Sequence, residues 1–362
     1  MLGGLPLKAL FRILISLIFI LVGTLYFSIQ KEEPDDQALI EDNSVNQEDQ
    51  QEKKKESIES FTDEDTNPKQ GLSTWIGRTG EDLIEDIGEP DRVDLSAYGY
   101  EWWVYNESLS SYVQFGVDED NKIVTLFSSA EEVNLYPFYI GQEVDSLYKK
   151  LNMSSFVEVE YSGTTYRFEL SEEDLHYRPL VKLGDIYAQV YLDKFLGEIS
   201  GVRYLDKETL VLHRPYELTY RGKLHEAPEP SENEWRQIES GSEAQVLDLT
   251  NIIRVRAGLS PLDSDKGAAE VAYLHSEDMM ENDYFSHESL DGSTLADRLK
   301  DGDVSYTTAG ENIAANYSDA VAAVEGWLNS KGHRENILNK DYTQLGVGVY
   351  HKYYTQNFIG IR

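Results

Sequence analysis

An uncharged apolar run near the start of the chain, followed by a long acidic segment, confines the folded domains to the residues beyond it. Residues 13–29 form an apolar run of 17 residues, at the short end of what crosses a bilayer as a helix. Lys8 and Arg12 precede it and acidic residues follow it, which favours a cytoplasmic N-terminus and an outside C-terminus. A cleaved signal peptide is the alternative, although no A-x-A site follows the run. We therefore expect residues 1–29 to be a cytoplasmic stub and a single-pass membrane anchor, with the C-terminal domains extracellular.

The acidic segment, residues 30–72, has the composition of a disordered stalk. From residue 31 to 72 there are 14 acidic and 5 basic residues, with few bulky apolar side chains. Such a segment cannot bury enough surface to offset the entropy of its chain, and repulsion between like charges extends it. We expect it to hold the following domains away from the membrane, or to begin a secreted protein if a signal peptide is cleaved.

Charge and cysteine content exclude several classes of function. The formal net charge is −34, so phosphates would be repelled and a nucleic-acid partner is not expected. The chain has no cysteine, which excludes disulfides, zinc-thiolate sites and thiol nucleophiles.

Residues 73–222 are aromatic, rich in strand patterns and weakly repeated. One copy begins with "IGRTGEDLIEDIGEPDR" and continues through "YGYEWWVYN" and "YVQFGVDEDNKIVTLFS". The second begins 64 residues later with "YIGQEVDSLYKKLN" and continues through "FVEVEYSGTTYRFEL" and "IYAQVYLDKFLGEISGVRYL". Each copy starts with Ile-Gly and a short helical pattern, then alternates as strands do. We expect two related α+β halves that pair into one domain.

A connector rich in proline and glutamate, residues 223–242, separates this domain from a C-terminal module, residues 243–362. His225 in the connector is expected to be solvated. The module is helical from residue 243, with further helices from Lys266 and from Ser318 and with Leu274 expected inward. Two alternating strands end the chain, so helices and strands form layers of an α+β fold.

Six segments of the module occur in an order that resembles a known family: "TNIIRVRAGLSPL", "HSEDMMENDYFSH", "AGENIA", "WLNSKGHRENILN", "YTQLGVGVY" and "YTQNFIG". Together they resemble the CAP superfamily of cysteine-rich secretory, antigen 5 and pathogenesis-related proteins, and its bacterial, cysteine-free branch in particular. The resemblance implies an α-β-α sandwich. The middle domain is similar to the CAP-associated N-terminal domain found beside such modules in Firmicutes.

The resemblance also implies a shared cleft lined by His287, Glu311 and His333. Two imidazoles and a carboxylate could hold a divalent cation such as zinc, or each imidazole could bond only to nearby backbone. The eukaryotic pattern has two histidines and two glutamates, and its second glutamate and second histidine fall on Ser330 and Asp341. His333 is the bacterial branch's own histidine.

The remaining polar residues of the motifs have structural interpretations. Gln344 and Gln356 are polar members of apolar strands, and each could face the cleft or satisfy backbone groups. His275 is expected to be a partly buried helix residue. Four more are expected to fix packing or loop geometry: Asn251, Arg254, Asn312 and Arg334.

We therefore predict an extracellular binding module that takes an envelope lipid, glycan, peptide or protein in the CAP cleft, with a divalent cation as an optional cofactor. The alternative is a metal-dependent hydrolase or protease with His287 and His333 as ligands and Glu311 as ligand or general base. Ser330, three residues before His333, is a weak candidate nucleophile, and no residue is assigned a catalytic role. A third possibility is a purely structural role at the envelope.

Overall fold

The computed structural model of the protein describes residues 67–150 and 154–361. All of them belong to one compact unit. The expected membrane anchor, residues 1–29, and most of the expected stalk lie outside the described residues. Within the described ranges, no helix is both long and apolar enough to cross a bilayer.

The described end of the expected stalk packs against the first domain. The backbone N–H of Asp185 donates to Asn67 Oδ1 at 2.7 Å, and that of Leu72 donates to the Asn134 carbonyl at 2.9 Å. Ordered structure is therefore present from residue 67, a little before the expected domain start at residue 73.

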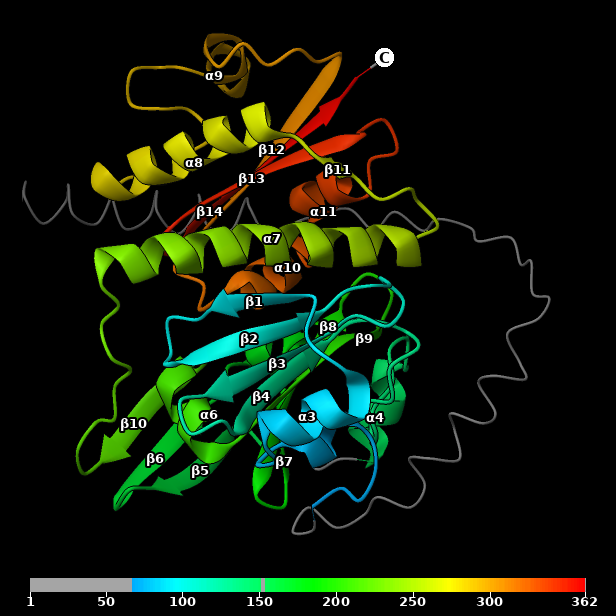
Figure 1. Cartoon of the computed structure of the whole chain (residues 1–362), viewed down its shortest axis with the longest axis vertical. Coiled ribbons are helices and arrows are strands. Elements are labelled where there is room, and N and C mark those ends of the chain that lie inside the picture. The colour runs from blue at the N-terminus through cyan, green and yellow to red at the C-terminus, as the bar shows by residue number, and fades with distance from the viewer. Residues whose placement is uncertain (1–66, 151–153, 362) are drawn as a thin grey trace, which may run out of the picture. The chain divides into compact units, whose positions relative to one another are not determined.

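The first domain contains two antiparallel sheets. Its elements are η1 (Leu72–Trp75), α3 (Gly80–Ile87), β1 (Arg92–Leu95), β2 (Tyr100–Tyr105), β3 (Val113–Asp118), β4 (Ile123–Ser128), α4 (Val144–Lys150), β5 (Phe156–Tyr161), β6 (Thr164–Glu169), α5 (Glu172–Tyr177), β7 (Leu180–Leu183), β8 (Ile186–Asp193), β9 (Glu198–Leu205), α6 (Lys207–His213) and β10 (Glu217–Arg221). The larger sheet has the order β1-β2-β3-β4-β9-β8-β7, and the smaller one β10-β6-β5 (Figure 1).

The larger sheet joins the two segments that the repeat indicated. Strands β1 to β4 come from the first and β7 to β9 from the second, and the two sets meet where β4 pairs with β9. Each set has a register shift in its long hairpin, at Gly116/Val117 and at Tyr191/Leu192. The repeat predicted that the strands of "FVEVEYSGTTYRFEL" would belong to one of two paired halves. Strands β5 and β6 are instead not part of the larger sheet; they pair with each other, and β6 also pairs with β10.

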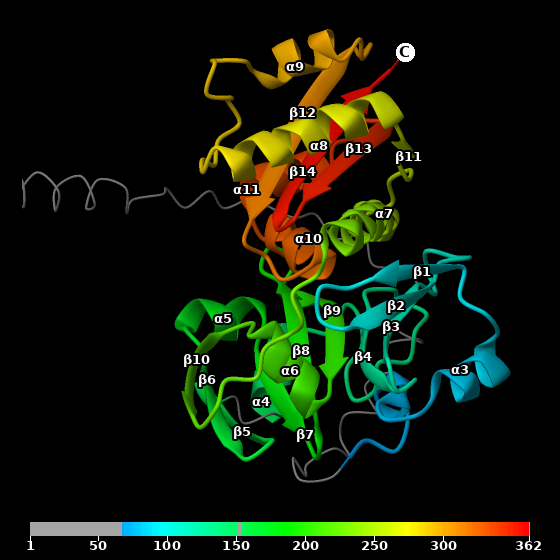
Figure 2. The same cartoon turned by 60° about the vertical axis from the view of Figure 1, so that its left-hand side comes forward.

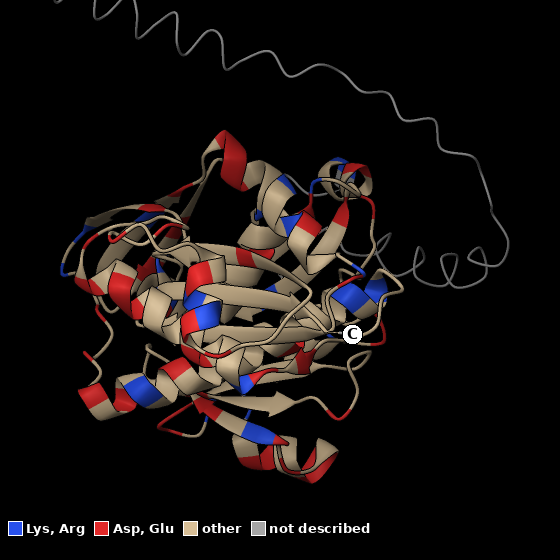
Figure 3. Ribbon diagram, turned by 90° about the horizontal axis from the view of Figure 1, so that it is seen from above, with Lys and Arg blue, Asp and Glu red and all other residues tan. Residues whose placement is uncertain are grey.

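The second domain is an α-β-α sandwich. Its elements are α7 (Glu232–Arg256), β11 (Asp263–Ser264), α8 (Lys266–Glu281), α9 (Leu295–Asp301), β12 (Thr308–Ala315), α10 (Ala320–Leu328), α11 (Lys331–Ile337), β13 (Gln344–Tyr350) and β14 (Tyr353–Gly360). The sheet order is β11-β13-β14-β12, with α8 on one face and α7 on the other (Figure 2). Acidic residues are spread over helices and loops of the described chain (Figure 3).

Alternation of glycine and valine in β13 explains how this sandwich is closed. A Cβ at Gly346 or Gly348 would collide with the backbone of α8, so only glycine lets that helix lie directly on the strand. Val347 and Val349 point to the opposite face and join the core beneath α7. In α8 itself Leu274 is 51% exposed, contrary to expectation, because the inward stripe runs through Val271, Ala272 and Met279.

Helix α7 begins earlier than the sequence pattern indicated. Ser231 accepts the N–H of Glu234 while the Glu234 carboxylate accepts the N–H of Ser231, a capping box that starts the helix at Glu232 within the expected connector. His225 is also not simply solvated: its Nε2 lies 2.9 Å from Glu208 Oε1 and its N–H donates to the Tyr166 hydroxyl.

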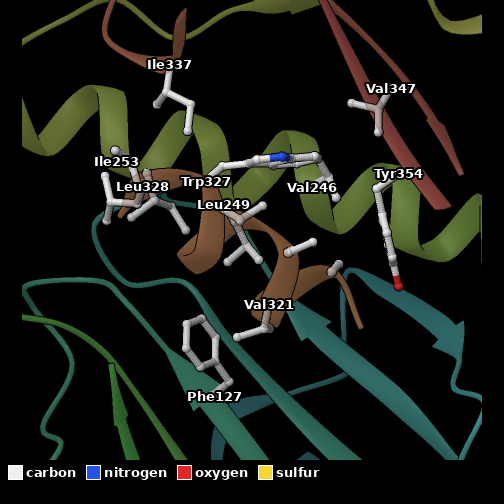
Figure 4. Packing of buried hydrophobic residues seen from close by; sticks show 14 of the residues in the cluster. Phe127, Val246, Leu249, Ile253, Val321, Trp327, Leu328, Ile337, Val347 and Tyr354 are labelled. Carbon is white, nitrogen blue, oxygen red and sulfur yellow. The ribbon is translucent and has the colours of Figure 1, made fainter. Parts of the chain in front are cut away.

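One hydrophobic cluster extends across both domains. Phe127 of β4 and Trp102 of β2 belong to the same buried cluster as Leu249 of α7, and as Val321 and Trp327 of α10 (Figure 4). Strand β4 is consequently covered on both faces, with Phe127 in this cluster and with Ile123 and Leu126 in the first domain's own core. The two domains therefore complete each other's apolar surface.

A buried polar network crosses the same boundary. The Arg203 guanidinium of β9 donates to both carboxylate oxygens of Asp319, the N-cap of α10, at 2.8 and 2.7 Å. It also donates to His213 Nδ1 at 3.1 Å, so His213 carries its proton on Nε2 and donates it to the Tyr100 hydroxyl 2.9 Å away. Burial, followed by the charge of Arg203, lowers the pKa of His213 to about 3, which keeps the ring neutral.

Two further contacts cross the boundary. Arg334 NH1 of α11 donates to Asp193 Oδ2 at 2.7 Å, so this arginine joins two domains in addition to fixing its loop. Glu325 of α10 accepts the Ser200 hydroxyl of β9 at 2.6 Å. Burial raises the pKa of Glu325 to about 7, and the charge of nearby Arg256 only partly offsets this.

We expect Glu325 to make the free energy of unfolding fall as pH rises through neutrality. Its folded pKa of about 7 lies above the ordinary 4.5, so its protonation stabilises the fold. That stabilisation is complete below about pH 4.5 and is lost as pH rises through 7. Glu325→Gln, which resembles the protonated form, should remove this part of the pH dependence in urea unfolding between pH 4.5 and 8.

The free energy of unfolding is compared between variant and wild type at each pH. The difference is what tests Glu325, because burial also raises the pKa of Glu243 to about 7 and that group remains in the variant. Glu119→Gln, in the exposed β3–β4 turn, is the matched control and should leave the wild-type curve unchanged. Parallel curves for Glu325→Gln and wild type would show that Glu325 does not titrate in this range.

Candidate functional site

Glu311 is the centre of a three-residue cluster in the CAP domain. It lies on β12 opposite Asn357 of β14, and its side chain is 4% exposed. One carboxylate oxygen lies 2.9 Å from Nδ1 of His287, and the other accepts Arg298 NH2 at 2.7 Å. The side chain of His287 is 56% exposed, so the cluster joins a buried carboxylate to the surface.

Arg298 fixes the loop that carries His287. It lies on α9, which begins with the capping box of Thr294 and Asp297. Its NH1 group donates to the carbonyls of His287 and Ser293 at 3.0 and 3.1 Å. Sequence reasoning missed this residue, because a basic side chain in the last turn of a helix is common and nothing local connects it to Glu311.

His275 lies on α8 behind the cluster and is fully buried, more so than the partly buried helix residue that was expected. Its Nε2 bonds to the Ser286 carbonyl at 3.0 Å and lies 4.0 Å from a Glu311 oxygen. Burial lowers its pKa, so the ring is neutral at pH 7 with its proton on Nε2.

His333 lies near His287 but contributes no described bond to Glu311. Burial lowers the pKa of His333, and the positive charge of protonated His287 lowers it further. Its carbonyl accepts the amide of Asn312, whose own oxygen accepts the amide of Asn336. The same Asn336 amide donates to the Glu311 carbonyl, so α11 is tied to β12 by side-chain amides.

An open pocket of about 420 Å³ lies at the cluster. It is lined by His287, Glu288, Thr294, Leu295 and Glu311. The same loop carries two exposed apolar side chains, Phe285 at 54% and Leu290 at 68% exposure.

Three residues expected to line the cleft are not among those that line this pocket. Ser330 is the N-cap of α11 and lines a different cavity, between the two domains. Asp341 is exposed in the turn before β13. Gln344 pairs through its backbone with Asp263 of β11 and Ile359 of β14. Gln356 is buried and satisfied internally, by Asn312 and Thr250.

The cluster does not fit a cation held by His287, Glu311 and His333 together. Both oxygens of Glu311 are hydrogen-bonded, one of them to a guanidinium cation that would repel a metal. In the described part of the chain, no three histidine or carboxylate side chains are arranged to share an ion. Glu311 instead lies behind His287 and orients its ring through Nδ1, so Nε2 is the nitrogen of His287 that a cation would use.

We predict that Arg298→Met will destabilise the domain strongly. The change removes the cation beside a buried carboxylate together with the bonds that hold the loop, and breaking such a pair costs about 3–5 kcal/mol. Lys300→Met, on the exposed face of the same helix, is the control and should change the free energy of unfolding by less than about 0.5 kcal/mol. Equal urea midpoints for the two variants would contradict the assigned role.

Both domains match known protein families. The chain matches the CAP-associated N-terminal family model over residues 76–216 and the cysteine-rich secretory protein family model over residues 247–361. It is 52% identical over 292 residues to the uncharacterized membrane protein YlbC of Bacillus subtilis strain 168, covering 81% of this chain and 84% of that protein.

Two crystal structures share the whole architecture. An extracellular protein containing an SCP domain from Bacillus anthracis is 44% identical, with a TM-score of 0.77 over 90% of this chain and 100% of that one. A cysteine-rich secretory protein from Staphylococcus aureus is 30% identical, with a TM-score of 0.72 over 82% and 97%. The chain therefore belongs to the cysteine-rich secretory protein (CAP) family, with a CAP-associated N-terminal domain preceding its CAP domain.

Proposed function

We propose that the protein is anchored in the cell membrane by residues 13–29, with both domains outside, and that the CAP pocket binds a peptide segment of an envelope partner without hydrolysing it. The apolar run supports the anchor, as does the description of the relative YlbC as a membrane protein. The description of the Bacillus anthracis structure as extracellular supports the orientation.

The observation that carries the binding proposal is the ion pair of Glu311 with Arg298. A general base needs a free carboxylate oxygen within reach of its proton donor, and both oxygens of Glu311 are engaged. Ser330, the one candidate nucleophile, lies at another cavity. The cluster is therefore better suited to fixing the shape of a binding loop than to catalysis, and the hydrolase alternative has less support.

A peptide matches the mixed character of the pocket. Four of its five lining residues have polar or charged groups, although most of the surface they present to the pocket is apolar. The pocket is open to solvent, whereas a lipid chain needs a deep apolar enclosure. Phe285 and Leu290 stand exposed on the adjoining loop and can cover apolar side chains of a peptide. Thr294, Glu288 and His287 can bond its backbone.

We expect the purified ectodomain, residues 67–362, which lacks the proposed anchor, to sediment with Bacillus subtilis envelopes. The double variant Phe285→Ala, Leu290→Ala should lose at least about tenfold in affinity, since each substitution removes an apolar side chain that the peptide would cover. Leu274→Ala, equally exposed on α8 of the same domain, is the matched control and should bind as wild type does. Digesting envelope proteins with protease beforehand should abolish binding. Undiminished binding to digested envelopes would reject a peptide ligand, and envelope hydrolysis lost in Glu311→Gln would establish the enzyme alternative.

We also propose that a divalent cation, where one binds, uses His287 and His333. Zinc at a hundredfold excess over its Kd should stabilise the protein by about 2.7 kcal/mol, seen as a rise in Tm. His287→Ala or His333→Ala should remove the rise, whereas Glu311→Gln should only weaken zinc affinity, because Glu311 supports a ligand without being one. A zinc-induced rise that persists in both alanine variants would disprove this site.

A further inference from the structure

A large cavity lies between the two domains, away from the His287 cluster. Its volume is about 1020 Å³, and it shares no lining residue with the pocket at Glu311. Its walls come from α5, from α6 with the connector that follows, and from the segment after β12 together with α10. Clefts of this size at domain boundaries are the usual location of small-molecule sites.

Aromatic rings are placed around this cavity. Tyr177 of the first domain and Trp235 of the second both line the cavity and are partly exposed, so they can contact a ligand. Trp235 is supported by His351, whose ring centroid lies 4.3 Å away. Tyr317 lies across α10 at Gly326, where any Cβ would collide with the tyrosine ring, so glycine is required for this placement.

Paired charges line the same cavity. Arg178 and Asp174 bond at 2.8 Å, and Arg214 donates to the His225 carbonyl at 2.8 Å with Glu226 3.7 Å away. Arg214 Nε is a buried donor without a described partner. Arg214 also has a positive φ of 45°, as does Asn316 at 64°, and side chains other than glycine keep such backbone mainly where the surroundings impose it.

The balance of charge in the cavity differs from that of the whole chain. Four basic residues line it, Arg178, Lys194, Arg214 and Lys352, against five acidic ones, Glu173, Asp174, Glu226, Glu229 and Glu325. The chain as a whole has 32 basic and 66 acidic residues. A strongly charged ligand of either sign would therefore meet repulsion as well as attraction here, and an aliphatic ligand would leave the paired charges desolvated.

We propose that this interdomain cavity binds a short neutral glycan. The flat apolar faces of sugar rings pack on tyrosine and tryptophan rings, and sugar hydroxyl groups both donate and accept. Paired carboxylates and guanidinium groups, together with the amide of Asn316, satisfy such hydroxyls at fixed angles. Because both domains supply walls, a bound glycan also joins the CAP-associated domain to the CAP domain.

The test uses the full-length protein and two neutral probes, the β-1,4-linked tetrasaccharide of N-acetylglucosamine and cellotetraose, in isothermal titration calorimetry. At least one probe should bind, and Trp235→Ala, Tyr177→Ala and Gly326→Ala should each raise its Kd about tenfold. Tyr177 is partly exposed, so its variant tests the proposal even if the other two fold poorly.

Two controls separate this site from other surfaces. Tyr220→Ala, an exposed tyrosine of β10 outside the cavity, should bind the glycan as wild type does, and so should His287→Ala in the CAP pocket. Failure of both probes to bind at millimolar concentration would overturn the proposal. So would binding that depends on His287, or binding of poly(glycerol phosphate) in preference to both neutral probes. Failure of both probes, or preference for the poly(glycerol phosphate), would leave the peptide proposal for the CAP pocket untouched, whereas glycan binding that depends on His287 would also count against it.

Discussion

The apolar surface shared by the larger sheet and helices α7 and α10 is the interaction on which the rest of the molecule depends. Helix α10 is buried almost completely, and its Val321, Val324 and Trp327 share one cluster with Phe127 and Tyr191 of the first domain. Since the hydrophobic contact excludes water, the buried Arg203–Asp319 pair must find its hydrogen-bond partners within the protein. His213 accepts a further hydrogen bond from Arg203 and donates one to Tyr100. The pair is costly to desolvate, so its contribution is to fix the register of the two domains more than to stabilise them.

The CAP cluster depends on strand pairing in the same way. Opposite Asn357, Glu311 is held on a strand whose backbone bonds leave its side chain little freedom, and Arg298 then neutralises it. The carboxylate is thereby converted from a reactive group into an anchor for the loop of His287. Retaining a buried ion pair where an apolar pair could pack is consistent with selection for a defined loop shape.

Periodicity in the sequence predicted the elements whose partners are local. Helix α8 begins at Lys266 as expected, and the alternation in β13 and β14 is visible because successive side chains of a strand point to opposite faces of the sheet. The start of α7 was missed although its capping box at Ser231 is present in the sequence, since proline and glutamate nearby suggested a connector. The separate sheet of β5 and β6 and the contacts of Arg298 and Arg334 could not be predicted, because they depend on pairings between residues far apart in the chain.

For the candidate site, the family resemblance predicts that His287 and Glu311 lie together, and they do. Motif position alone assigns Ser330 to the same cleft, but Ser330 lines the other cavity.

Helix α11 is the element that contacts both proposed sites. Ser330, its N-cap, lines the interdomain cavity, and His333 one turn later lies beside His287. Arg334 ties the helix to Asp193 of the first domain, and Asn336 ties it to Glu311. Contiguity of this kind is not by itself coupling, which requires an element with two arrangements that both ligands bias. What the geometry provides is a short helix whose position is fixed from the first domain on one side and from the His287 cluster on the other. The bond from Arg334 to Asp193 is therefore the contact through which a displacement of the first domain would reach this helix.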